Sequence, residues 1–191
     1  MWVDHLILFL AWLLFYGIHS ALASTRVKQA IPLGDSIYRI LYSLLSTILF
    51  FGLLLLGAMI YSMLLFPPTP FTQYTGLMLA AIGLFIMKRA FRNYSFRAFM
   101  GFKKNLKEGL KTDGIQAKIR HPLYTGTLLV VIGYVFFNPQ LTSLVILIAL
   151  LIYLPFGIRW EEKKLIALYG EAYEQYRSKV PALFPSLGLK K

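Results

Sequence analysis

Five long apolar runs divide this chain of 191 residues, and they constrain its fold more than any other feature. An α-helix rises about 1.5 Å per residue, so a run of about 20 apolar residues crosses the hydrocarbon core of a bilayer. The hydrophobic fraction of 58% exceeds the roughly 45–50% of soluble domains. The sequence therefore predicts an all-α polytopic membrane protein with about five transmembrane helices, at residues 2–24, 40–66, 74–91, 123–137 and 141–158.

The chain length fits a single integral membrane domain, residues 1–191, in which residues 1–92 form an N-terminal three-helix part. The tetrapeptide ALAS at 21–24 resembles a signal-peptidase site, but the apolar run before it is long and further runs follow. We therefore expect the first helix to be retained.

The fourth and fifth apolar runs are joined by Asn138, Pro139 and Gln140 alone, which predicts a helical hairpin at 123–158. The fourth run is short for a membrane span. A helix that begins at Pro122 would have adequate length, because proline suits a first helical turn.

The 20 lysines and arginines are confined to alternate connections between the apolar runs. Three lie at 26–39, ten at 88–120 and seven at 159–191, and the remaining connections carry none. Because basic loops stay on the cytoplasmic side of a membrane, this pattern predicts an external N-terminus and a cytoplasmic C-terminus.

The same distribution accounts for the net charge of +12 without a nucleic-acid partner, and we expect membrane lipids around the chain instead. It also gathers the polar segments 88–122 and 159–191 on one face, where chemistry on a soluble charged ligand should take place. The chain has no cysteine, which excludes disulfides, thiolate metal sites and a cysteine nucleophile.

The polar stretch LKEGLKTDGIQAKIRHPLYTG leads into the fourth apolar run. Asp113 and Gly114 are a turn signal, and exposed N–H groups around such a turn can hold ribose or carboxylate oxygens. If the helix starts near Pro122, then Arg120 and His121 lie where free N–H groups and the helix dipole favour an anion.

The alternative for Arg120, His121 and Tyr124 is interfacial anchoring, in which such side chains reach toward the lipid headgroups. In the combined sequence RHPLYTG, Gly126 also leaves room for close approach by a neighbouring helix or a ligand. We favour a ligand site for the combination.

A second stretch, GIRWEEKKLIALYGEAYEQYRSKVPALFP, follows the fifth apolar run. Arg159, Glu161 and Glu162 lie near its start, and acidic residues are scarce in a chain with eight Asp and Glu. Leu165 and Leu168 follow at helical spacing, so we expect an amphipathic C-terminal helix that continues the fifth run. The carboxylates can hold an ammonium group or ribose hydroxyls; the alternative is a solvated face of Glu–Lys pairs.

The three histidines, His5, His19 and His121, lack the spacing of a metal site, and we predict none. His19 lies within the first apolar run, where a polar residue is either functional or a hydrogen-bonding contact between helices. Both alternatives remain open for it.

The ordered motifs GIQAKIRHPLYTG, a helical hairpin and EEKKLIALYGEAYEQYRSKVPALFP resemble the isoprenylcysteine carboxyl methyltransferase and phospholipid methyltransferase superfamily of integral membrane enzymes. The similarity covers roughly residues 106–185, which the resemblance implies to be the methyltransferase core. The N-terminal segments HSALASTRVKQAI and YRILYSLLS resemble the bacterial branch with NnrU-type proteins and methanethiol S-methyltransferases. That branch implies a bacterial inner membrane, with the active site facing the cytoplasm.

The resemblance implies S-adenosylmethionine as the cofactor and S-adenosylhomocysteine as its product. On the substrate side we expect Arg159 and Glu162 to act. The expected cofactor-binding residues are Leu110, Lys111, Gly114, Gln116, Arg120, His121, Pro122, Tyr124 and Glu161.

Three positions depart from the family pattern. Gln116 stands where members often have tyrosine, and Glu108 lies near a position that is often histidine or glutamine. Gly157 stands where several members have arginine, and the sequence leaves open whether Arg159 replaces it.

Methyl transfer from a sulfonium is an in-line displacement that depends on positioning, and an anionic thiolate or carboxylate needs no strong base. We therefore expect a methyltransferase acting on a lipophilic or small thiol, carboxylate or amine. The alternatives are an NADPH-dependent membrane reductase of the sterol and steroid type, or a non-enzymatic membrane protein. The lack of inverted repeats argues against a transporter. Neither the acceptor nor the oligomeric state follows from the sequence.

Overall fold

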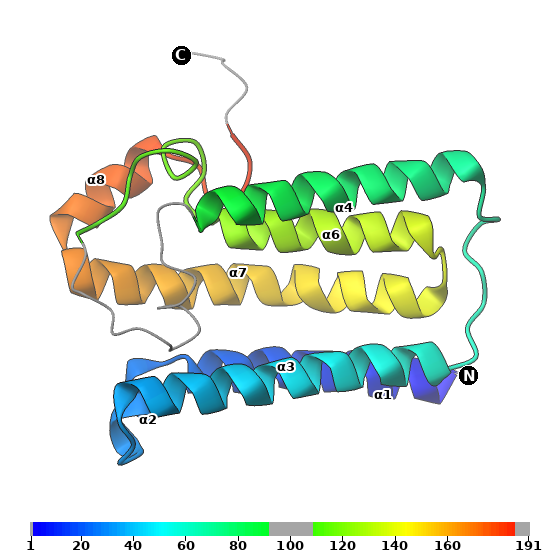
Figure 1. Cartoon of the computed structure of the whole chain (residues 1–191), viewed down its shortest axis with the longest axis horizontal. Helices are drawn as coiled ribbons and strands as arrows, with labels where there is room; N and C mark the ends of the chain where they lie inside the picture. Colours follow the sequence, from blue (N-terminus) through cyan, green and yellow to red (C-terminus); the bar gives the residue numbers. More distant parts are fainter. Residues whose placement is uncertain (1, 92–108, 186–191) are drawn as a thin grey trace.

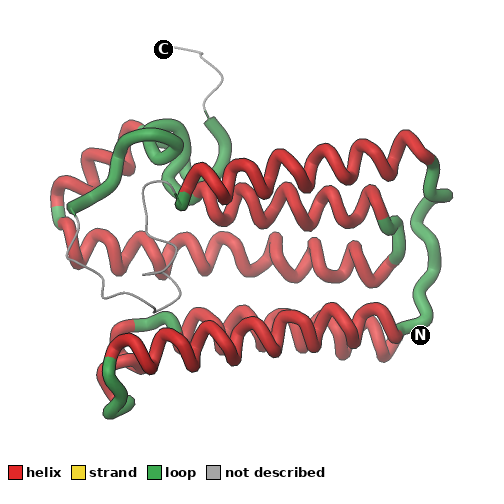
Figure 2. The backbone as a smooth tube through the Cα atoms, in the orientation of Figure 1, coloured by secondary structure: helices red, strands yellow, loops and turns green. Residues whose placement is uncertain are grey.

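The computed structural model describes residues 2–91 and 109–185, and the regular structure of these residues is helical (Figures 1 and 2). The helices are α1 (Trp2–Leu22), α2 (Thr25–Ala30), α3 (Asp35–Met59), α4 (Pro70–Ala90), α6 (Pro122–Phe137), α7 (Leu141–Tyr169) and α8 (Glu171–Lys179).

Local signals set several helix ends. Thr69 and Thr72 form a reciprocal capping box at the start of α4. Helix α6 begins at Pro122, as predicted, because a first-turn proline leaves no amide hydrogen unsatisfied. Helix α7 continues beyond the fifth apolar run to Tyr169, and Gly170, with φ of 58°, turns the chain into α8.

Among the described residues, four helices (α1, α3, α4 and α7) are long and apolar enough to cross a membrane, and the predicted fourth span is the shorter apolar helix α6. Helix α6 has 16 residues and is therefore about 24 Å long, shorter than a hydrocarbon core of about 30 Å. The second span also differs from its predicted range of 40–66. It is α3, Asp35–Met59, and the connection beyond it is bonded to the α6–α7 turn, where the Leu141 amide donates to the Met63 carbonyl at 3.0 Å.

The long helices lie in two groups, with α4, α6 and α7 on one side and α1 and α3 on the other (Figure 1). Helix α7 joins the groups. Its Val145, Ile146 and Ala149 form a core with Leu8 and Trp12 of α1. Its next turns pack Leu150 and Leu154 against α6. Large apolar side chains cover the outer faces of α1, α3 and α4, as expected for an integral membrane protein in contact with lipid.

Helices α4 and α6 pack closely through two pairs of glycines. A Cβ atom on Gly76 would lie 2.5 Å from the carbonyl oxygen of Gly133, and one on Gly83 would lie 2.5 Å from that of Gly126. The close neighbour of Gly126 is therefore a helix, which was one of the two predicted alternatives.

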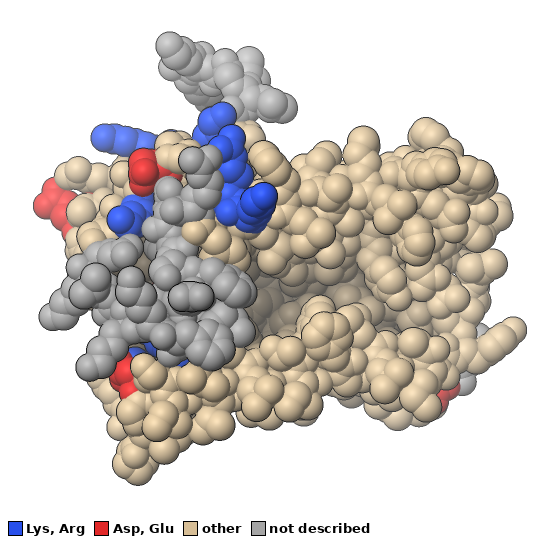
Figure 3. Space-filling view, in the orientation of Figure 1, with Lys and Arg blue, Asp and Glu red and all other residues tan. Residues whose placement is uncertain are grey.

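The two ends of the bundle differ in charge. On the face shown in Figure 3, Lys and Arg side chains gather over the end formed by α8 and the connection 109–121. We call this the basic end. At the opposite end, the connection before α4 is bonded to the α6–α7 turn, where the Leu65 amide donates to the Pro139 carbonyl at 2.8 Å.

Candidate functional site

Ionisable side chains from two distant segments meet at the basic end. Arg120 and His121 stand directly before α6, while Glu161 and Glu162 lie on α7. The Glu162 Oε1 atom is 2.7 Å from Arg120 Nη2 and 3.2 Å from His121 Nε2. On its other side, His121 Nδ1 is 3.4 Å from Glu161 Oε2. The structure thus brings the predicted residues of both motifs together, with the His121 ring between two carboxylates.

The C-terminal segment 181–183 holds Arg120 and His121 in this place. Their main-chain amides donate to carbonyl oxygens of this segment at 2.9 and 3.0 Å. The Thr125 hydroxyl, one turn into α6, donates to a third carbonyl of the segment at 2.5 Å. The first two contacts join main-chain atoms and therefore do not depend on which side chains Arg120 and His121 carry.

The guanidinium of Arg120 is already engaged by acceptors within the protein. Its Nε donates to Glu162 at 2.9 Å, and its Nη1 donates to the carbonyl oxygens of Arg177 (at 3.0 Å) and Val180. Arg120 thereby ties α7 to α8 and to the segment that follows it. A ligand carboxylate at this guanidinium would have to displace one of these acceptors.

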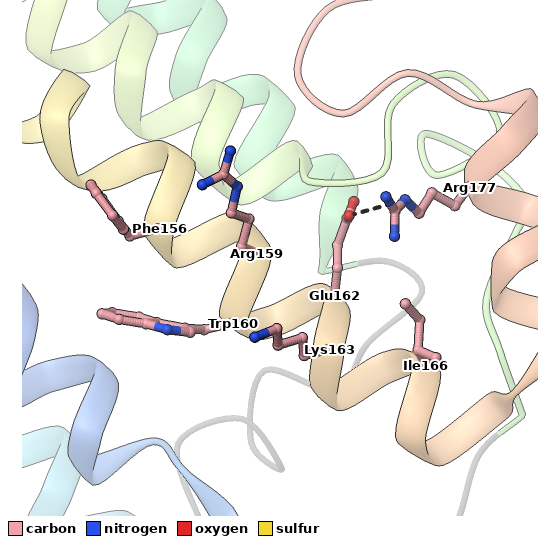
Figure 4. A pocket seen from close by; sticks show the side chains of 7 residues that line it. All are labelled: Phe156, Arg159, Trp160, Glu162, Lys163, Ile166 and Arg177. Carbon is pink, nitrogen blue, oxygen red and sulfur yellow. Dashed lines mark ion pairs between the residues drawn. The ribbon is translucent and has the colours of Figure 1, made fainter.

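Glu162 lies beyond the apolar residues of α7 and is the central acceptor of this cluster. It is 7% exposed, and its second oxygen is 3.4 Å from Arg177 Nε (Figure 4). Burial raises the pKa of Glu162, but hydrogen bonds from Arg120 and His121 outweigh burial and hold the pKa below its ordinary value. Glu162 is therefore an anion at neutral pH.

Glu161 forms the open edge of the cluster. Its side chain is 45% exposed, compared with 9% for that of Glu162. The Tyr124 ring stacks on His121, with 5.5 Å between centroids and 22° between planes. A ligand can reach Glu161 more easily than Glu162 or His121, which is 4% exposed.

The other predicted cofactor residues lie along the connection before α6. Gly114 is exposed in a turn with φ of 61°, a left-handed conformation that glycine adopts readily. Gln116 is buried, Leu110 and Lys111 are half-buried, and Pro122 is buried at the helix start.

Tyr176 of α8 holds this connection, because its hydroxyl donates to the Gln116 carbonyl at 2.6 Å. Glu108, the second departure from the family pattern, lies outside the described residues.

A pocket of about 400 Å³ lies beside α7, and both predicted substrate-side residues, Arg159 and Glu162, line it (Figure 4). Positions 157 and 159 lie about 200° apart around α7, so Arg159 projects from a different side of the helix than position 157. The pocket is lined by Phe156, Arg159, Trp160, Glu162, Lys163, Ile166 and Arg177.

Tyr153 occupies the space beside Gly157 and was missed by sequence reasoning. A Cβ atom at position 157 would lie 2.8 Å from both Cζ and Oη of Tyr153. The signal that could have found it is spacing, because Tyr153, Gly157 and Glu161 are four residues apart and share a helix face.

The family model for NnrU protein matches residues 7–185. The chain belongs to the NnrU family. This NnrU-family chain is 42% identical over 82 residues to methanethiol S-methyltransferase of Crocosphaera subtropica, which covers 42% of the chain and 31% of the relative. It is 37% identical over 93 residues to protein-S-isoprenylcysteine O-methyltransferase of Schizosaccharomyces pombe, which covers 48% of the chain and 39% of the relative.

A methanethiol S-methyltransferase of Pseudomonas deceptionensis is 37% identical over 71 residues, covering 36% of the NnrU-family chain and 26% of the relative. The chain thus matches less than two fifths of the length of each of these relatives. No solved structure matches it. These relatives confirm the resemblance to the isoprenylcysteine carboxyl methyltransferase superfamily.

Proposed function

We propose that this NnrU-family protein is an S-adenosylmethionine-dependent methyltransferase whose site lies at the basic end, facing the cytoplasm. Its acceptor is a lipophilic or small thiol, carboxylate or amine. The observation that carries the proposal is the cluster of His121, Glu161 and Glu162, which joins two motifs of a methyltransferase superfamily at one end of an apolar bundle.

The chemistry of the residues at this end fits the proposed cofactor. Glu161 offers a half-exposed carboxylate for an ammonium group or for ribose hydroxyls. The turn at Gly114 offers main-chain N–H groups, and Lys111 offers a positive charge for a carboxylate. The stacked rings of His121 and Tyr124 offer an aromatic wall.

When bound, the cofactor supplies an activated methyl group, and the protein's task is to position it and the acceptor. We assign Arg120 and Glu162 to the framework of the site, because their contacts fix the loop against α7 and α8. Glu161, His121 and Tyr124 then form the part that meets the cofactor. The pocket at Arg159 supports a substrate-side role for that residue.

The cytoplasmic orientation rests on charge. All 20 Lys and Arg residues fall in alternate connections between the apolar runs, and basic connections stay in the cytoplasm. S-adenosylmethionine is a charged, soluble compound and would enter from that side, while a lipophilic acceptor would enter from the bilayer.

Calorimetric titration of the detergent-solubilised protein with S-adenosylhomocysteine tests the proposal. Glu161→Gln keeps the size of the side chain and removes its charge, and Glu171→Gln is a matched control on α8, where Glu171 accepts a bond from Gln175. Since a hydrogen bond to a charged group contributes about 1.5–3 kcal/mol, we expect Glu161→Gln to weaken binding about 10- to 100-fold and the control to bind as wild type does.

Two results would refute the proposal. One is a wild-type protein that gives no heat with saturating S-adenosylhomocysteine. The other is a protein that binds NADPH in its place, which would favour a membrane reductase. Equal binding by wild type and Glu161→Gln would refute the site and leave the function standing.

A further inference from the structure

The pocket beside α7 carries an excess of positive charge on its described lining. Arg159 and Lys163 of α7 line it together with Arg177 of α8, and the one acidic residue among these lining residues is Glu162. Arg120, which is not a lining residue, holds Glu162 from behind through contacts of 2.7 and 2.9 Å. Because Arg120 already balances the Glu162 charge, the pocket suits an anion.

The three cations of the pocket can each offer donors to such an anion. Among the residues that the structure describes, no carboxylate forms an ion pair with Arg159 or Lys163. These two are four residues apart, so they are neighbours on one face of α7, where like charges repel. Arg177 is 50% exposed and turns its Nε atom toward Glu162, while a guanidinium has five N–H donors. A bound anion would relieve the repulsion and join α7 to α8.

The pocket lies where α7 leaves the apolar part of the bundle. With 29 residues, α7 is about 43 Å long, whereas a hydrocarbon core is about 30 Å thick. The fifth apolar run of the sequence ends at residue 158, directly before Arg159. The cations therefore stand at the level of the lipid headgroups, where basic pockets bind the phosphates of anionic lipids.

Two aromatic rings adjoin these cations. The side chains of Phe156 and Trp160 are 50% and 52% exposed, and their ring centroids are 6.3 Å apart. Figure 4 shows both rings projecting to the same side of α7. Phe156 stands about one turn before Trp160, so the pair extends from the cations toward the apolar part of the helix. An acyl chain would cover these rings, whereas a free phosphate ion would leave them exposed.

We propose that this pocket binds one anionic phospholipid, as a ligand and not as a methyl acceptor. Its phosphate lies among the three cations, and an acyl chain lies along the two rings. Guanidinium and ammonium groups are the usual partners of phosphate oxygens, and arginine can bind two of them at once. The inference goes beyond the methyltransferase function and does not depend on it, because it rests on charge and position alone.

The competing explanation is that these cations meet the membrane surface as any basic residue does, without a specific site. Two adjacent lysines separate the explanations. Lys163 lines the pocket, whereas Lys164 is exposed on α7 and is not among the lining residues. Lys163→Gln and Lys164→Gln remove the same charge at neighbouring positions, and Arg159→Gln removes a second cation of the pocket.

Native mass spectrometry of the full-length protein in detergent counts the lipids that remain bound. The probes are dioleoyl phosphatidylglycerol, dioleoyl phosphatidylcholine and dioleoylglycerol, which differ in headgroup charge and share their acyl chains. We expect one phosphatidylglycerol per chain at saturation, weaker binding of phosphatidylcholine and no retention of dioleoylglycerol. Loss of a charged hydrogen bond should weaken phosphatidylglycerol binding about 10-fold or more in Lys163→Gln and Arg159→Gln, while Lys164→Gln should match wild type.

Four results would overturn the proposal. They are equal binding of phosphatidylglycerol and phosphatidylcholine, equal effects of Lys163→Gln and Lys164→Gln, displacement of the lipid by excess inorganic phosphate, and methyl transfer to phosphatidylglycerol. Displacement would assign the pocket to a soluble phosphate compound instead. Failure of wild type to bind S-adenosylhomocysteine is a different result, because it removes the methyltransferase function and leaves the lipid site standing. Should a variant not fold, the lipid preference of wild type still decides.

Discussion

Glu161 and Glu162 are neighbours in the chain, but their side chains have different surroundings. Successive residues point about 100° apart on a helix, so Glu162 faces Arg120 while Glu161, with a side chain that is 45% exposed, meets Nδ1 of His121. The sequence identified both residues as site candidates because acidic residues are scarce. It could not assign their separate surroundings, since these depend on Arg120, 42 residues away.

At the residue scale, the first prediction concerns Glu162. Glu162→Ala leaves the Arg120 guanidinium, 11% exposed, without its carboxylate. Removal of one partner of a buried ion pair costs about 3–5 kcal/mol, so the variant should unfold at a markedly lower temperature. Glu161→Ala is the control, and its 45% exposed side chain predicts a much smaller loss. Equal melting temperatures for the two variants would contradict this division of roles.

The second prediction concerns pH. The pKa of Glu162 is lower in the folded protein than its unfolded value of about 4.3. The carboxylate therefore contributes stability above about pH 4.3, and that contribution is lost as the pH falls through the folded pKa. Melting temperatures recorded between about pH 6 and 3 should fall more steeply for wild type than for Glu162→Gln. Parallel curves would show that other groups control the acid sensitivity.

At the scale of helices, local sequence signals predicted where α6 begins and ends, but they did not predict which helix packs against it. Pro122 and the Asn138–Pro139 turn predicted the ends of α6, because proline acts on its own backbone. The partner of α6 was not predictable in the same way. Helices that are apolar on all sides carry no stripe that marks a neighbour, so the packing of α4 on α6 came only from the structure.

The glycine pairs of α4 and α6 give the third prediction. Gly83→Ala would place a Cβ atom 2.5 Å from the Gly126 carbonyl, so the helices must separate and the protein should lose stability. Gly52→Ala on α3 is the control, because nothing lies within 4 Å of its added Cβ atom. Alanine is favoured over glycine in a helix by about 1 kcal/mol, so the control should be neutral or more stable in a thermal unfolding assay. Equal effects of the two substitutions would argue against close packing at Gly83.

At the scale of the whole molecule, the distribution of charge is the strongest signal in the sequence. It predicted a basic end, and the structure places α8 and the connection before α6 together there (Figure 3). The sequence also predicted which two motifs meet, through the family resemblance. It did not indicate that segment 181–183 binds the loop at Arg120, because those bonds join main-chain atoms and depend little on side-chain identity.

The fourth prediction tests the orientation in the membrane. The chain has no cysteine, so single cysteines can be introduced without a background. Tyr61 is 87% exposed at the end opposite the site, and Lys179 is exposed at the basic end. In intact spheroplasts, a membrane-impermeant maleimide should label Tyr61→Cys at once and Lys179→Cys only after lysis. The reverse pattern would place the site outside the cell.

The central claim is that the cluster of His121 and Glu161 serves methyl transfer. Its most direct measurement is mass spectrometry of the products formed from methyl-deuterated S-adenosylmethionine and a panel of thiols, carboxylates and amines. We predict that the deuterated methyl group appears on an acceptor in equal amount to the S-adenosylhomocysteine formed, and that His121→Ala and Glu161→Gln greatly reduce both products. Wild-type protein that yields no labelled acceptor, or yields as much with either variant, would contradict the claim.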